Sequence, residues 1–210
     1  MKKLNYDTYK LLLNAELYTS EHNSIDNINP WYALTHNIFK NPPLNCINDL
    51  WKIVAFAYSW MPRIPFIYTE KIINPDELLI QLQALKSGDS SNLKSLLEQL
   101  VPVINNSLTG TSKVLHFIAP DYIPIIDSNV LWGWDIFFGQ LYPDYGITKL
   151  PHYTSILKNS KEHIAMYLKY TETLNQWVAN SEGRITIREL EFAFYTLSKK
   201  IGKSQKIYSM

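Results

Sequence analysis

One stretch of the chain, residues 108–134, limits the possible folds more than any other. It runs LTGTSKVLHFIAPDYIPIIDSNVLWGW and places a glycine turn, a lysine at a helix start, two prolines and an acidic residue at the next helix start within a short span. Pro120 lacks a backbone N–H and its ring clashes with the preceding turn, so a helix capped by Thr111 or Ser112 has to end there. The run that follows contains Pro124, and we expect it to be extended.

An acidic residue at the end of this extended run, Asp127, is predicted to cap a second helix. Its carboxylate can accept hydrogen bonds from the free N–H groups of the first helical turn. The apolar positions of that helix recur at helical spacing and are Val130, Trp134, Phe137 and Leu141. We therefore expect a helix, an extended connection and a second helix in this stretch.

The charged residues of this stretch are predicted to approach each other. Lys113 lies at the start of the first helix, and a short helix followed by an extended segment lets the chain return to Asp127. The positive potential at helix N-termini lowers the pKa of an amine and stabilises a carboxylate. Two interpretations are open on the sequence, a catalytic pair or a structural ion pair that ties two helix starts together.

The pattern Leu-x-Gly-x-x-Lys occurs at 108–113 and is followed by a predicted helix, a proline-containing extended run, Asp127 and a new helix. This arrangement resembles the helix-hairpin-helix DNA glycosylases of the endonuclease III and 8-oxoguanine glycosylase superfamily. The resemblance implies an all-α fold, with Lys113 as the nucleophile and Asp127 as its catalytic partner. This sequence has Ser112 at the position of the second hairpin glycine, and 14 positions separate Lys113 from Asp127.

Most of the chain also resembles a group of small uncharacterised bacterial proteins, and this second resemblance implies no activity. It is carried by Ser112-Lys113, Pro120, Pro124 and Asp127-Ser128, together with AYSWMP at 57–62 and IRELEFAFYTL at 187–197.

The helix-hairpin-helix interpretation assigns a hairpin at Leu108 to Ser112, whose exposed N–H groups would hold a DNA phosphate while the target base flips out. His116, one turn after Lys113, could orient a phosphate or be a satisfied, partly buried side chain. Trp132 could wedge beside a flipped base, whereas the spacing of Trp134 is typical of a core residue. The predicted nucleic-acid-binding residues are Thr109, Gly110, Thr111, Ser112, His116 and Trp132.

Helical periodicity continues through the rest of the sequence, which indicates an all-α fold of about eight helices. The glycosylase resemblance implies that this fold has a helix-hairpin-helix-like core. Asn74-Pro75-Asp76-Glu77 and Thr186 with Glu189 are capping signals that predict two helix starts. Polar residues 20–30 are predicted to form a linker. We expect one helical domain over 1–210, with residues 1–30 and 203–210 peripheral to it.

Composition narrows the classes of partner. The chain of 210 residues is 46% hydrophobic and 19% charged, which is ordinary for a globular domain. A net charge of +1 argues against a strongly electrostatic nucleic-acid binder. The segment from Gly183 to the end has six basic and two acidic residues, and its net charge of +4 fits either a solvated end or a nucleic-acid contact.

Several kinds of site have no sequence support. Cys46 is the only cysteine and the five histidines have no ligand spacing, so we expect no disulfide and no metal site. Nucleotide-binding loops are absent, and we expect no cofactor. Without a membrane-length apolar run or a signal-peptide core, we expect a cytoplasmic protein with no membrane partner.

Two functions remain as hypotheses on the sequence. The first is a DNA N-glycosylase that flips and excises a damaged or modified base with Lys113 and Asp127. The alternative is a non-catalytic helical module that binds nucleic acid or a protein partner.

Overall fold

A computed structural model describes residues 3–17, 42–61, 64–147 and 161–208, with the side chains of the last helix described as far as Ile201. The described residues form eight α-helices and no β-strand, which confirms the predicted all-α class. The helices are α1 (Tyr6–Leu17), α3 (Ile47–Tyr58), α4 (Pro75–Lys86), α5 (Leu93–Val103), α6 (Leu108–Ile118), α7 (Ser128–Trp134), α8 (Lys161–Asn180) and α9 (Ile187–Tyr208). Short 3-10 turns lie at Thr69–Lys71 and Pro143–Tyr145, and a π-helix at Asp135–Leu141 continues α7.

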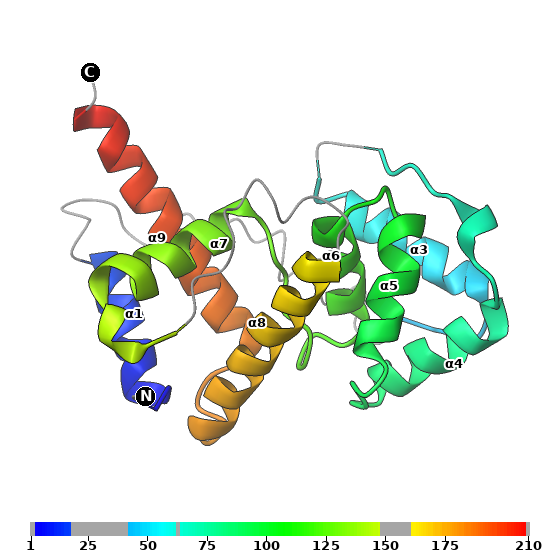
Figure 1. The fold of residues 1–210 in the computed structure, drawn as a ribbon, viewed down its shortest axis with the longest axis horizontal. Coiled ribbons are helices and arrows are strands. Elements are labelled where there is room, and N and C mark those ends of the chain that lie inside the picture. The colour runs from blue at the N-terminus through cyan, green and yellow to red at the C-terminus, as the bar shows by residue number, and fades with distance from the viewer. Residues whose placement is uncertain (1–2, 18–41, 62–63, 148–160, 209–210) are drawn as a thin grey trace.

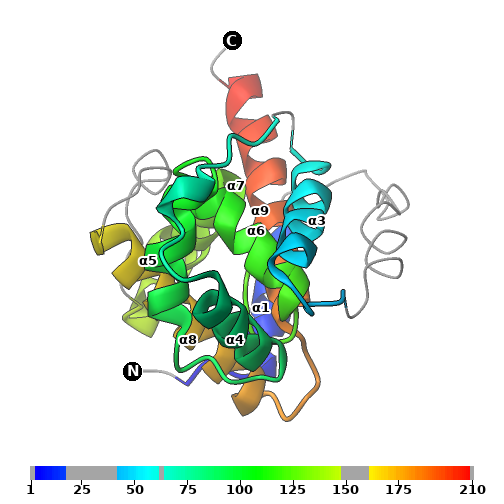
Figure 2. The ribbon, with the colours of Figure 1, turned by 90° about the vertical axis from the view of Figure 1, so that its right-hand side faces the viewer.

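The helices form two groups that meet along α8 (Figure 1). Helices α3, α4, α5 and α6 make one group, and α1, α7 and α9 make the other. Helix α8 contacts α5 on one side and α9 on the other. Seen from the first group, in Figure 2, α1 and α9 lie behind α3 and α6. The extended segment between α6 and α7 therefore connects the two groups, and a site on it can take side chains from both.

The capping signals of the sequence specify the starts of two helices. Asn74 accepts a hydrogen bond from the backbone N–H of Glu77 at 3.2 Å, with Pro75 at the first helical position of α4. Thr186 and Glu189 form a reciprocal capping box at the start of α9: Glu189 N–H donates to Thr186 Oγ1 at 3.2 Å, and Thr186 N–H donates to Glu189 Oε2 at 2.7 Å. Both predicted helix starts are confirmed.

The start of α6 differs from the prediction. Its N-cap is Ser107, whose hydroxyl accepts from Gly110 N–H at 3.0 Å, and the helix begins at Leu108 instead of after Thr111 or Ser112. The turn that precedes it uses Asn105 and Asn106, both at positive φ (57° and 48°). Asparagine tolerates this left-handed conformation, so the chain reverses direction here before Ser107 can cap α6.

Helix α7 begins where it was predicted, because Asp127 caps it. Asp127 Oδ1 accepts from the backbone N–H groups of Asn129 and Val130, both at 2.9 Å. The predicted apolar positions Val130, Trp134 and Phe137 are buried, whereas Leu141 is 47% exposed. The π-helix explains the difference, because its wider turn rotates Leu141 away from the face that a regular α-helix would have given it.

The expected peripheral position of residues 1–30 is wrong for α1. Leu4, Leu12 and Ala15 belong to the buried core, and α1 packs against α9. Trp177 on α8 donates its indole N–H to the carbonyl oxygen of Asn5 at 2.8 Å, which fixes this end of the chain. The predicted linker at 20–30 lies outside the described residues. Within the part of the chain that the structure describes, no helix has both the length and the apolar character to cross a membrane.

Candidate active site

The segment between α6 and α7 is an extended chain that is buried without a strand beside it. Residues 123–126 are buried, so their backbone polar groups need partners from elsewhere. Side chains from three helices supply these partners. The phenolic O–H of Tyr167 donates to Pro124 O at 2.7 Å, and that of Tyr170 donates to Ile125 O at 3.3 Å. Helix α8 thus holds the segment from one side.

Helix α6 holds the same segment from the other side. Ile126 N–H donates to Ser112 Oγ at 3.2 Å, and the same hydroxyl donates to Thr109 O at 2.9 Å. His116 Nδ1 donates to Ile123 O at 2.7 Å, so this nitrogen carries the proton. The polar residues of α6 that face the segment therefore position Asp127 relative to α6.

The third contact comes from a fully buried acid, Glu191 on α9. Its Oε1 accepts from Ile125 N–H and lies 3.9 Å from His116 Nδ1, while its Oε2 accepts from Arg188 Nη1 at 3.0 Å. Burial raises the pKa of Glu191 from 4.5 to about 8, an effect that outweighs the opposing influence of Arg188. The carboxyl group gives this part of the core a proton that can be exchanged near neutral pH.

Lys113, on α6, is half-buried and lies within electrostatic range of Asp127, Arg188 and Glu191. We call these four residues the cluster. The pKa of Lys113 is lowered, first by burial and then by the positive charge of Arg188, while Asp127 and Glu191 oppose the shift. No hydrogen bond or salt bridge to its ammonium occurs among the described residues. The structure therefore brings Lys113 and Asp127 into electrostatic contact without joining them in an ion pair, which differs from the structural salt bridge considered for this pair.

The predicted hairpin at Leu108 to Ser112 is wrong. These residues form the first turns of α6, and Gly110, Thr111 and Ser112 are buried. The helical hairpin that does exist joins α5 to α6 through residues 104–107. Gly110 is needed for packing, since a Cβ there would meet the Tyr58 hydroxyl, which explains why a glycine signal appeared inside a helix. The N–H groups of Thr111 and Ser112 face intrahelical acceptors instead of a phosphate.

The remaining predicted nucleic-acid-binding residues lie in different surroundings. His116 is fully buried, and its bond to Ile123 fits the structural interpretation and leaves no access to a phosphate. Trp132 is half-buried on α7, and Trp134 is a core residue as its spacing predicted. Thr109 is half-buried at the start of α6. Of the predicted set, only Thr109 and Trp132 keep access to solvent.

Sequence analysis did not single out two functional groups of the cluster, Arg188 and Glu191. The helical spacing of Glu191 could have indicated that it is buried. It stands four residues after Ile187 and three before Phe194, on the apolar face of α9. An acid on a buried helical face requires a partner, and Arg188 one turn earlier supplies it.

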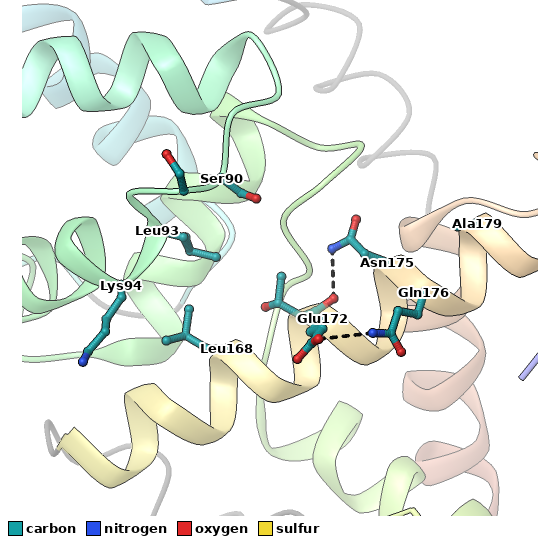
Figure 3. Close-up of a pocket in the computed structure, with 10 residues that line it drawn as sticks. Ser90, Leu93, Lys94, Leu168, Glu172, Asn175, Gln176 and Ala179 are labelled. Atoms are coloured by element: carbon teal, nitrogen blue, oxygen red, sulfur yellow. Dashed lines mark hydrogen bonds between the residues drawn. The ribbon is translucent and has the colours of Figure 1, made fainter. Parts of the chain in front are cut away.

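Two open grooves on the surface lie away from this cluster. The larger, of about 510 Å³, is between the start of α5 and the middle of α8, and Figure 3 shows Lys94 and Leu168 on its two walls. Glu172 and Gln176 on α8 are joined there by a hydrogen bond of 3.2 Å. The smaller, of about 400 Å³, is lined by Lys71, Glu77 and Glu98 among others. Neither groove includes Lys113 or Asp127.

No protein family, no curated protein and no solved structure matches this chain. The function therefore has to be argued from the geometry of the cluster.

Proposed function

We propose that the protein is a DNA N-glycosylase-like enzyme, with Lys113 as the nucleophile and Asp127 as the group that stabilises positive charge on the sugar. The observation that carries the proposal is the state of Lys113. Its amine is half-buried, its pKa is lowered, and no described partner holds its proton. A lysine can attack only when it is neutral, and burial is a common way to make it so.

The proposed chemistry needs two groups at different positions. The Lys113 amine attacks C1′ of the target deoxyribose, so an N–C1′ bond forms as the glycosidic bond breaks and the base leaves with its electron pair. Asp127 is held at the N-terminus of α7 by two backbone N–H groups that donate to its carboxylate, which fixes its orientation. Its negative charge stabilises the positive charge that develops on the sugar ring.

The position of the cluster constrains how DNA would reach it. Neither surface groove includes Lys113. DNA has to form one wall of the reaction site, and the base has to leave the stack before it can approach the amine. The two groups of helices meet at this segment, so we expect a small separation of α6 from α9 to make Lys113 more accessible to the base.

Borohydride trapping tests the nucleophile. Lys113 should form an imine with the C1′ aldehyde of an abasic-site duplex, and borohydride reduction should make that link permanent. We expect a covalent protein–DNA adduct in wild type and none in Lys113→Gln. Lys94→Gln, which alters an exposed lysine on α5, is the matched control and should retain the adduct. Equal trapping in wild type and Lys113→Gln, or no trapping in wild type on abasic sites and a panel of damaged bases, would refute the assignment.

One observation favours the alternative function, a helical module without catalysis. The buried amides of residues 110–112 remove the phosphate site that the glycosylase interpretation assigned to them. Measuring DNA affinity against salt concentration separates the two forms of this alternative, because neutralising several phosphates makes affinity fall steeply as salt rises. A nucleic-acid module should show that fall without trapping, and a protein-binding module should show no DNA affinity even at low salt.

A further inference from the structure

The outer face of α9 has a continuous row of two aromatic side chains with a cationic side chain at each end. Arg188, Phe192, Tyr195 and Lys199 recur at helical spacing and so lie on one face. The rings of Phe192 and Tyr195 are 6.4 Å apart and nearly parallel, at 19°. The Arg188 guanidinium lies 6.0 Å from the Phe192 ring centre, and Lys199 Nζ lies 5.4 Å from that of Tyr195. We call these four residues the α9 row.

The α9 row differs from the buried aromatic core in its exposure. Phe192 and Tyr195 are 37% and 36% exposed, whereas Trp134, Phe137 and Phe194 form the buried aromatic core. Most of the core ring pairs meet edge-on or tilted, for example Trp134 and Phe138 at 60°, whereas Phe137 and Trp177 are stacked at 26°. Two exposed aromatic rings beside two cations are the combination of side chains that single-stranded nucleic acid uses for base stacking and phosphate contact.

The charge of this face is also one-sided. Lys199 and Lys200 follow the rings on the same helix. Of the acidic residues of α9, Glu189 caps the helix start through Thr186, and Glu191 is fully buried and pairs with Arg188 of the row. The C-terminal turns of α9 extend beyond the other helices in Figure 1.

We infer that the α9 row binds single-stranded nucleic acid, with bases stacked on Phe192 and Tyr195 and phosphates beside Arg188 and Lys199. Charge complementarity selects this partner, because a polyanion with flat apolar bases satisfies both components of the row. Arg188 links the row to the cluster, since it pairs with Glu191 and influences the pKa of Lys113. The inference goes beyond the proposed glycosylase activity, because strand binding requires no lysine chemistry.

The test is fluorescence anisotropy with a fluorescein-labelled oligothymidylate of about 12 nucleotides, within the usual range for such sites. Removal of both rings in Phe192→Ala/Tyr195→Ala should weaken binding roughly 5- to 150-fold for each stacked base lost. Tyr195→Phe retains the ring and should bind like wild type. Lys199→Ala should lower the slope of log Kd against log salt by about 0.7.

The matched control is Phe66→Ala, which removes an exposed ring from the other group of helices (61% exposed) and should leave Kd unchanged. Absence of binding by wild type at low salt, an unchanged Kd in the double variant, or an equal loss in Phe66→Ala would overturn the inference. If the double variant does not fold, Lys199→Glu decides the question alone: weakened binding supports the row, and unchanged binding refutes it. The probe contains no lesion or abasic site, so this result is independent of borohydride trapping.

Discussion

Substitution of one glycine should separate the two helices that contact each other most closely. At Gly133 on α7, a Cβ would lie 2.6 Å from the carbonyl carbon and 2.9 Å from the Cα of Phe194 on α9. The carbonyl oxygen of Phe194 would lie closer still. Ordinary van der Waals contact begins at 3.4 Å, so relieving the contact with the carbonyl carbon alone requires the backbones to move apart by at least about 0.8 Å, from 2.6 to 3.4 Å. No side-chain rotation can relieve a clash between two backbones.

The expected cost of Gly133→Ala follows from what this movement does to the core. Trp134 and Phe137 pack on Phe194, with ring centres 5.3 and 6.1 Å away, and a gap approaching 1 Å removes a quarter to a half of such contact energy. Overpacking costs about 1–3 kcal/mol, and the upper end applies when backbone must move. The better helix propensity of alanine offsets about 1 kcal/mol of this cost. We expect a net loss of about 2 kcal/mol, the upper overpacking cost of about 3 less the gain of about 1.

Urea denaturation followed by tryptophan fluorescence and circular dichroism measures this loss. Asn129→Ala, a half-buried position on the same helix, is the matched control and should change the free energy of unfolding by less than about 1 kcal/mol. A loss below about 1 kcal/mol in Gly133→Ala would show that α7 and α9 do not approach each other as closely as the structure places them.

Two further predictions concern the cluster. Burial raises the pKa of Glu191 from 4.5 to about 8, so between these pH values the folded chain holds a proton that the unfolded chain has released. The contribution of this proton to the free energy of unfolding is therefore fully present below pH 4.5 and is lost as pH rises through about 8. Glu191→Gln should flatten this fall in urea denaturation between about pH 4 and about pH 9, and an unchanged slope would exclude Glu191 as its cause. Asp127→Asn keeps an oxygen for the two capped N–H groups and should cost less than about 2 kcal/mol, while Asp127→Ala should cost about 1 kcal/mol more. A much larger loss in Asp127→Asn would mean that the carboxylate is a structural charge and would count against its proposed role.

Local chemistry was sufficient to predict much of the fold. The capping residues Asn74, Asp127 and Thr186 act on N–H groups within three positions of themselves, so their effect does not depend on the rest of the molecule. Pro120 is equally local, and α6 ends at Ile118 before it. Apolar periodicity then predicted which faces are buried, because a helical face has the same spacing wherever it packs.

Tertiary structure decided the features that depend on residues far apart in the sequence. Gly110 suggested a turn, but it lies inside α6. A glycine is needed at this helical position because the Tyr58 hydroxyl occupies the space that a side chain would take. Glu191 became a buried partner of the α6–α7 segment only because α9 packs beside α7, 66 positions after Ile125. The sequence by itself determined where helices start and which faces are apolar, since those depend on neighbouring residues. Which polar groups share a buried cluster depends on long-range packing, and only the folded chain determines it.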